Sequence, residues 1–110
     1  MNIKSFQDNV KRLSQHLDTK SPEQRILYLI SELGELADEV IEFRTANDTS
    51  PETIANIKKR IGLEIYDVIW NAVDLANMLD IDLEASFKEK TAINEKRNWS
   101  LSGYIDSDTK

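Results

Sequence analysis

The sequence predicts an all-α domain built from four helices, and three observations indicate this fold class. The chain of 110 residues contains only 3 glycines and 2 prolines, too few for a turn-rich β fold. Apolar residues recur at spacings of three and four over long stretches, as they do on one face of a helix. Both prolines follow a serine, and Ser-Pro places a favoured N-cap directly before a favoured first helical residue.

The first two helices are defined by an apolar stripe and by a capping signal. A helix over roughly residues 3–18 is indicated by five apolar residues on one face, Ile3, Phe6, Val10, Leu13 and Leu17. A second helix, from residue 22 to about 44, is expected to begin with a capping box in which Ser21 and Gln24 bond to each other's backbone.

The starts of the third and fourth helices are also predicted from capping signals. Ser50 and Pro51 begin a helix that is expected to reach about residue 79. A cap at Asp80 or Asp82 begins the last helix, which ends near residue 96 or 97. We therefore expect a single domain over residues 1–99 and a flexible C-terminal tail over residues 100–110.

The apolar surface of the second and third helices is broader than one chain can bury. On the second helix it has a centre and a flank, formed by Ile26, Ile30, Leu33, Ala37 and Ile41 and by Leu29, Leu36, Val40 and Phe43. Residues 65–79 of the third helix carry only Asp67 and Asp74 as charges. A helix that is apolar nearly all round is normally buried on more than one side. We therefore expect a second subunit to cover this surface, most simply in a symmetric homo-oligomer.

Composition excludes several classes of function. The formal net charge of −6 should repel nucleic acid and anionic membrane surfaces. The chain has no cysteine, and His16 is its single histidine, which excludes disulfides, thiol catalysis and cysteine- or histidine-rich metal sites. No uncharged run has the length of a membrane span, and the N-terminus lacks the apolar core of a signal peptide. A cytoplasmic protein that binds neither nucleic acid nor membrane is expected.

Two pairs of acidic residues are the candidate metal ligands. Glu32 and Glu35 lie on the second helix, and Glu64 and Asp67 lie on the third, each pair spaced so that both carboxylates share one helix face. Carboxylates from two neighbouring helices can form an oxygen site for Mg²⁺. The first pair alone is more typical of a solvated helix face. The second lies on a helix with few other charges and with no lysine or arginine over residues 62–87, so a cation is the simplest counter-charge.

Further polar residues are placed to contact a substrate. Asn71 lies one turn beyond Asp67 and is either an oxygen donor for a ligand or a polar group satisfied inside the bundle. Lys90, Asn94 and Arg97 share one face of the fourth helix, which suits polyphosphate oxygens, although basic residues near a helix C-terminus also complement the helix dipole.

Aromatic residues and glycines beside the acids have two readings each. Tyr66 and Trp70 could stack on a base or belong to the core. Gly34 and Gly62 lie beside the acid pairs, which indicates close approach of either a packed helix or a ligand to the backbone.

Taken together, these motifs resemble the MazG-type nucleotide pyrophosphohydrolases of the all-α NTP pyrophosphatase superfamily. The resemblance covers about residues 22–99. It rests on E-x-x-E in the context E-L-G-E-L, E-x-x-D followed by V-I-W, K-x-x-x-N-x-x-R, and a closing R-N-W. Two departures from the family pattern are a serine at position 31, where a glutamate doublet is common, and Tyr66, where glycine often precedes the aspartate.

The resemblance implies a fold, an activity and a set of site residues. The fold would be a four-helix MazG-like bundle completed by homo-oligomerisation, as a dimer or a tetramer. The activity would be Mg²⁺-dependent cleavage of a nucleoside triphosphate between its α and β phosphates, with Mn²⁺ as a substitute metal. The metal ligands would be Glu32, Glu35, Glu64 and Asp67, and the substrate contacts would come from Asn71, Lys90, Asn94 and Arg97, in the same site or in that of a neighbouring subunit.

The identity of the general base and of the substrate stays open at this point. A carboxylate that takes a proton from the attacking water is expected, and Glu35 and Glu39 are the candidates. One alternative keeps the chemistry but changes the substrate, as in phosphoribosyl-ATP pyrophosphohydrolase, dimeric dUTPase or an enzyme for a modified nucleotide. Another alternative is a non-catalytic helical interaction module that uses the broad apolar surface.

Overall fold

The computed structural model describes residues 1–17 and 21–97, and these residues form four helices and no strand. The helices are α1 (Ile3–Ser14), α2 (Pro22–Thr45), α3 (Pro51–Met78) and α4 (Leu83–Glu95). The all-α prediction is therefore confirmed for this part of the chain. The expected tail over residues 100–110 lies outside the described residues. No helix in the described ranges is both long and apolar enough to cross a bilayer.

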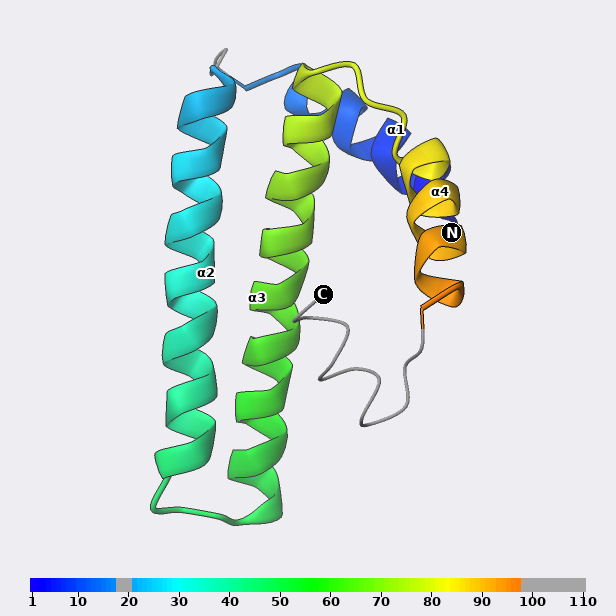
Figure 1. Ribbon diagram of the computed structural model, residues 1–110. Coiled ribbons are helices and arrows are strands. Elements are labelled where there is room, and N and C mark those ends of the chain that lie inside the picture. The colour runs from blue at the N-terminus through cyan, green and yellow to red at the C-terminus, as the bar shows by residue number, and fades with distance from the viewer. Residues whose placement is uncertain (18–20, 98–110) are drawn as a thin grey trace.

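The two long helices α2 and α3 form an antiparallel hairpin, and the two short helices lie to one side of its upper part (Figure 1). Helix α1 packs against α3, and α4 packs against α1. The Cα radius of gyration is 17.6 Å, whereas a compact chain of this length has about 13 Å. One copy of the chain is therefore an open arrangement of four helices, and the closed four-helix bundle implied by the sequence is not formed within it.

Local side-chain bonds set the start of each helix. The predicted capping box of α2 is present, since Ser21 and Gln24 each accept a hydrogen bond from the other's backbone N–H at 3.1 Å. Ser50 caps α3, and Asp82 caps α4 by accepting from the Ala85 N–H at 3.3 Å. Asp80, the other candidate cap, instead adopts a left-handed conformation with φ 55° in the preceding turn, which aspartate tolerates better than most residues.

The first helix is shorter than its apolar stripe predicts. It ends at Ser14, because the next N–H groups bond three residues back in a tightened turn, from His16 to Leu13 and from Leu17 to Ser14. Leu13 and Leu17 are exposed, so the end of the stripe has no apolar surface to cover in a single chain.

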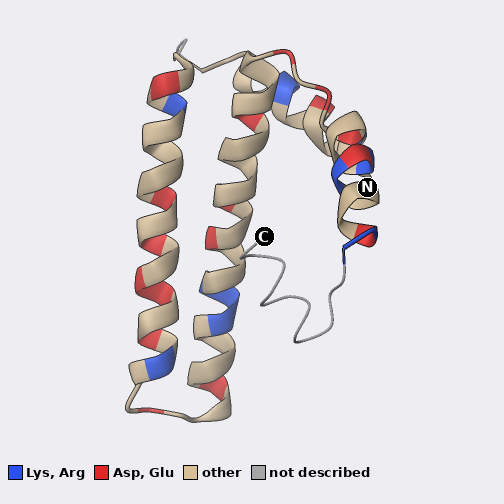
Figure 2. Ribbon diagram, in the orientation of Figure 1, with Lys and Arg blue, Asp and Glu red and all other residues tan. Residues whose placement is uncertain are grey.

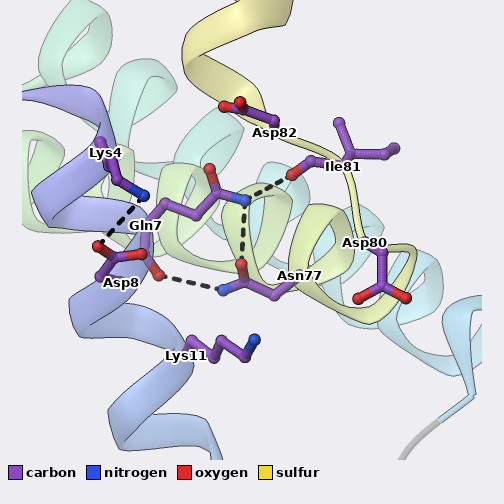
Figure 3. Close-up of a pocket in the computed structure, with 8 residues that line it drawn as sticks. All are labelled: Lys4, Gln7, Asp8, Lys11, Asn77, Asp80, Ile81 and Asp82. Atoms are coloured by element: carbon purple, nitrogen blue, oxygen red, sulfur yellow. Dashed lines mark hydrogen bonds and ion pairs between the residues drawn. The ribbon is translucent and has the colours of Figure 1, made fainter.

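A glutamine fastens α1 to the α3–α4 connection (Figure 3). Gln7 donates through Nε2 to Asn77 Oδ1 at 3.0 Å and to the Ile81 carbonyl at 2.7 Å, and its Oε1 accepts from the Leu83 N–H at 3.1 Å. Asn77 Nδ2 donates back to the Gln7 carbonyl at 3.2 Å. These bonds run along the wall of a polar pocket between α1 and the connection, and they hold α1 and the start of α4 on α3.

The inner face of α2 differs from the one expected. The apolar stripe taken as its centre is exposed in a single chain, with Ile26, Ile30, Leu33 and Ile41 between 39% and 59% accessible. The side chains turned towards α3 recur every three or four residues, and charged residues alternate with apolar ones among them: Arg25, Leu29, Glu32, Leu36, Glu39 and Phe43. The face of α2 that contacts α3, here called the seam, is thus half charged. The most apolar surface of α2 faces outward.

Candidate metal centre between the two long helices

Charged residues of the seam meet in three layers spaced by seven residues. Because α2 and α3 are antiparallel, a step of seven residues up one helix corresponds to seven residues down the other. In Figure 2, acidic positions of α2 lie between one basic position near each end of that helix, and α3 has acidic positions above a basic stretch and another acidic position near its lower end. The layers pair Arg25 with Asp74, Glu32 with Asp67, and Glu39 with Arg60.

The layer nearest α1 is a buried ion pair. Arg25 Nη2 lies 2.9 Å from Asp74 Oδ2, and the two side chains are 9% and 5% exposed. Arg25 Nη1 also donates to Asn71 Oδ1 at 2.7 Å. The guanidinium carbon lies 5.4 Å from the Tyr28 ring centroid and 5.8 Å from that of Trp70. This layer thus joins the two helices through a largely buried charge pair.

The layer nearest the hairpin loop is an accessible ion-pair network. Arg60 Nε donates to Glu39 Oε1 at 3.0 Å, and its Nη2 donates to Glu42 Oε2 at 2.6 Å. The Arg60 side chain is 43% exposed. The hydrogen bond to Glu39 raises the pKa of Arg60, so this residue is a permanent cation beside the acidic pairs.

The middle layer contains only acids. Glu32, Glu35 and Glu64 each offer a carboxylate oxygen, and these oxygens lie within 4.8 Å of one another. Asp67 is outside that group, but its charge acts on both Glu32 and Glu64. Burial, followed by the charges of the neighbouring carboxylates, raises the pKa of Glu32 and of Glu64 above the usual range. Without a cation, this layer is electrostatically unfavourable.

The residues present fit a hard divalent cation. Glu64 Oε2 is buried and has no hydrogen-bond partner among the described residues, and such an atom needs a ligand. The donors are all carboxylate oxygens, the ligand type of Mg²⁺ and Mn²⁺. Each flanking layer contains an arginine opposite its acid, whereas the middle layer does not. A metal ion would supply the positive charge that this layer lacks.

Of the other predicted site residues, one lies beside the acid layer and three lie on or just beyond α4. Asn71 is 8% exposed, accepts from Arg25 and donates to the Asp67 carbonyl at 2.8 Å, which favours the alternative of a polar group satisfied within the fold. Lys90, Asn94 and Arg97 lie on or just beyond α4, away from the acid layer of the same chain (Figure 1). Their roles as substrate contacts stay predictions, and within one copy of the chain they do not reach the acids.

The structure also shows what surrounds the two aromatic residues and the two glycines beside the acids. Tyr66 makes an edge-to-face contact with Phe6 of α1, with ring centroids 5.9 Å apart, and Trp70 faces Arg25, so both rings have partners inside the chain. A Cβ atom added at Gly34 or Gly62 would meet nothing within 4 Å among the described residues. Close helix packing within the chain therefore does not explain these two glycines.

Two arginines that pair with acids across the seam, Arg25 and Arg60, are not part of the sequence prediction. Each lies on the opposite helix from its acidic partner, so the sequence around either acid does not reveal it. The available signal was the seven-residue spacing of charges on both long helices, read in opposite directions as a hairpin requires.

The fold and this site define an all-α protein with a cluster of carboxylates between two antiparallel helices. The sequence comparison identifies the family: a profile of the MazG nucleotide pyrophosphohydrolase domain matches residues 20–99, and the chain belongs to this family. The resemblance inferred from the motifs is therefore confirmed.

The chain is also similar to one curated protein over part of its length. A dATP/dGTP diphosphohydrolase from Cyanophage S-2L is 39% identical over 49 residues, which is 44% of this chain and 47% of that protein. The match thus spans about half the length of the relative. No solved structure matches the chain significantly.

Proposed function

We propose that the protein is a Mg²⁺-dependent nucleoside triphosphate pyrophosphohydrolase that cleaves between the α and β phosphates to give a monophosphate and pyrophosphate. One observation carries the proposal. In a chain of the MazG family, three carboxylates converge within 4.8 Å, and a buried oxygen of one of them has no partner among the described residues. Such an oxygen site, open to solvent on one side, suits a cation that also binds phosphate oxygens.

Each acid of the middle layer has a defined part in this proposal. Glu32, Glu35 and Glu64 hold the metal, and Asp67 completes the site from the next turn of α3. When bound, Mg²⁺ or Mn²⁺ neutralises phosphate charge and makes a bound water more acidic. The carboxylates orient the substrate through the metal and exclude other counter-ions from the layer.

Glu35 is the better candidate for the general base. Glu39 Oε1 already accepts a hydrogen bond from Arg60 Nε at 3.0 Å. Glu35 lies within the acid cluster and is exposed, so one of its oxygens can hold the metal while the other reaches a water at the reacting phosphate. The Glu35→Gln variant should therefore lose more of kcat than the Glu39→Gln variant.

Purine deoxynucleotides are the first substrates to test. The matched phage relative is named for dATP and dGTP, and the matched segment covers about half of it. We propose dATP and dGTP as the leading candidates within a panel of the eight common ribo- and deoxyribonucleoside triphosphates.

The active form is proposed to be a homo-oligomer, dimeric or tetrameric. The exposed apolar residues of α2 continue on α3, where Leu63, Ile65, Tyr66 and Ile69 are between 43% and 58% accessible. An exposed surface of this kind marks an interaction site. A second copy would also explain how Lys90, Asn94 and Arg97 approach an acid layer, namely that of the neighbouring subunit.

Pyrophosphate release from the eight nucleotides, measured with Mg²⁺ and with EDTA, tests the proposal. Release that requires Mg²⁺ and is lost in Glu64→Gln is the expected result. The competing function, a catalytically silent interaction module, is favoured by the same apolar surface. It predicts no release from any nucleotide and no change in melting temperature on adding Mg²⁺.

A further inference from the structure

We propose that Arg60 is a substrate-binding residue that contacts the pyrophosphate half of a nucleoside triphosphate bound at the acid layer. The inference rests on the proposed function and adds a residue that none of the sequence motifs includes. It follows from where Arg60 lies and from how weakly it is committed to its present partners.

The position of Arg60 places its charge next to the metal ligands. Arg60 precedes Glu64 by four residues on α3, so the two side chains lie on the same face, about one helical turn apart. Its bond to Glu39 directs the guanidinium across the seam to α2, one layer below Glu32. A polyphosphate whose α phosphate lies at the acid layer can therefore extend its next two phosphates towards Arg60.

The exposure of Arg60 separates it from the other arginine of the seam. Arg25 is 9% exposed and paired with an equally buried aspartate, which suits a structural role. Arg60 is 43% exposed, and its partner Glu42 is 54% exposed. Exposed ion pairs contribute little to stability, so Arg60 can exchange part of this pairing for a phosphate group at small cost.

Arg60 also has hydrogen-bond donors to spare. A guanidinium has five N–H donors. The bonds to Glu39 and Glu42 use Nε and Nη2, and Nη1 makes no hydrogen bond with another described residue. Planar, forked donors of this kind match the oxygens of phosphate groups. Arg60 can therefore bind a phosphate while it remains attached to Glu39.

Arg60 is the basic residue at this end of the hairpin that bonds to acids of α2, whereas the neighbouring Lys58 lies with its Nζ 5.9 Å from the Phe43 ring centroid. The basic residues of α4 lie beside α1, apart from the hairpin. At the other end of the acid layer, Arg25 is enclosed by Asp74, Asn71 and the rings of Tyr28 and Trp70. The hairpin thus has a polarity, with an aromatic end suited to the nucleoside and an accessible cationic end suited to the leaving group.

Binding of inorganic pyrophosphate in Mg²⁺ buffer, measured by titration calorimetry, tests the inference. Arg60→Gln should weaken pyrophosphate binding about tenfold or more, because it removes a charge-assisted contact. Lys59→Gln is the matched control, since it removes the same charge one residue away, about 100° round the helix, and should leave the affinity unchanged. The thermal shift produced by Mg²⁺ alone should be retained in both variants.

A purely structural role for Arg60 makes different predictions. Glu42→Gln breaks one of the two ion pairs of Arg60 without removing the guanidinium, so it should leave pyrophosphate affinity unchanged or raise it. The inference is overturned if Glu42→Gln weakens pyrophosphate binding as much as Arg60→Gln, if Arg60→Gln has no effect, or if the wild type binds no pyrophosphate. Pyrophosphate binding through Arg60 without hydrolysis of any nucleotide would contradict the proposed function and leave this inference standing.

Discussion

The buried pair of Arg25 and Asp74 gives the sharpest stability prediction. Arg25→Met would leave the Asp74 carboxylate, 5% exposed, without its cation and would also remove a donor from Asn71. Breaking a buried ion pair by removing one partner costs about 3–5 kcal/mol. A domain of this size has a total stability of about 5–15 kcal/mol, so the single variant should lose a large part of it.

The predicted loss can be measured by urea unfolding at one fixed protein concentration, because association would otherwise shift the midpoint. With an m value of about 1.5 kcal/mol/M, a loss of 3 kcal/mol lowers the midpoint by about 2 M. Asp74→Leu should behave similarly, since it leaves the guanidinium buried. The double variant Arg25→Met/Asp74→Leu should recover most of the loss, because both charges are then absent.

An exposed ion pair serves as the control. Lys88 and Glu84 are 3.5 Å apart, with side chains 77% and 39% exposed, and Lys88→Gln should change stability by less than about 0.5 kcal/mol. The reasoning is refuted if Arg25→Met costs less than about 1 kcal/mol, or if the losses of the two single variants simply add in the double variant.

Four further predictions concern the acid layer and other parts of the hairpin. Mg²⁺ should raise the melting temperature of the wild type but not of Glu64→Gln, and an equal shift in both proteins would remove Glu64 from the metal site. In EDTA, the free energy of unfolding should fall as pH rises above the usual carboxyl range. The pKa of Glu64 is raised in the folded protein, so over this pH range the folded state binds more protons than the unfolded chain. Glu64→Gln should flatten this part of the pH profile. The effect of pH on the Asp48 contribution to stability has the opposite sign, because hydrogen bonds from Ser50 and Thr53 lower the pKa of Asp48. This contribution is lost as pH falls through the lowered pKa, and it should be absent in Asp48→Asn. Gly34→Ala should stabilise the isolated chain by about 1 kcal/mol, because the new methyl group meets nothing within 4 Å, and a loss of stability or of self-association would show that another molecule approaches there.

Much of the fold could be predicted, because its determinants are local. The Ser21–Gln24 capping box and the Ser50 cap fix where the two long helices begin, and both depend on residues within one turn of each other. The end of α1 could not be predicted from periodicity, since Leu17 continues the apolar stripe after the backbone has left the helix at Ser14. In that region Leu13 and Leu17 cover no apolar surface within one chain, so the apolar pattern does not decide where the helix ends.

The acid pairs could be predicted, but their setting could not. Helical spacing is sufficient to place Glu32 beside Glu35 and Glu64 beside Asp67. The partners of these acids depend on how two helices are aligned, and the most apolar stripe of α2 was a poor guide to that alignment, because Ile26, Ile30 and Ile41 face outward. Hydrophobicity alone therefore indicated the wrong inner face, while the regular spacing of charges indicated the right one.

The central position of the acid layer in the hairpin has a consequence for the order of folding events. The loop over residues 46–50 joins α2 and α3 directly, so pairing of the two helices can begin at the loop and proceed towards α1. It then meets the attractive layer of Arg60 first, the repulsive layer of Glu32 and Asp67 second, and the attractive layer of Arg25 last. Like charges thus lie midway along this route. We therefore expect Mg²⁺ to speed refolding of the wild type and not of Glu64→Gln, because a bound cation would neutralise the repulsion in the middle layer.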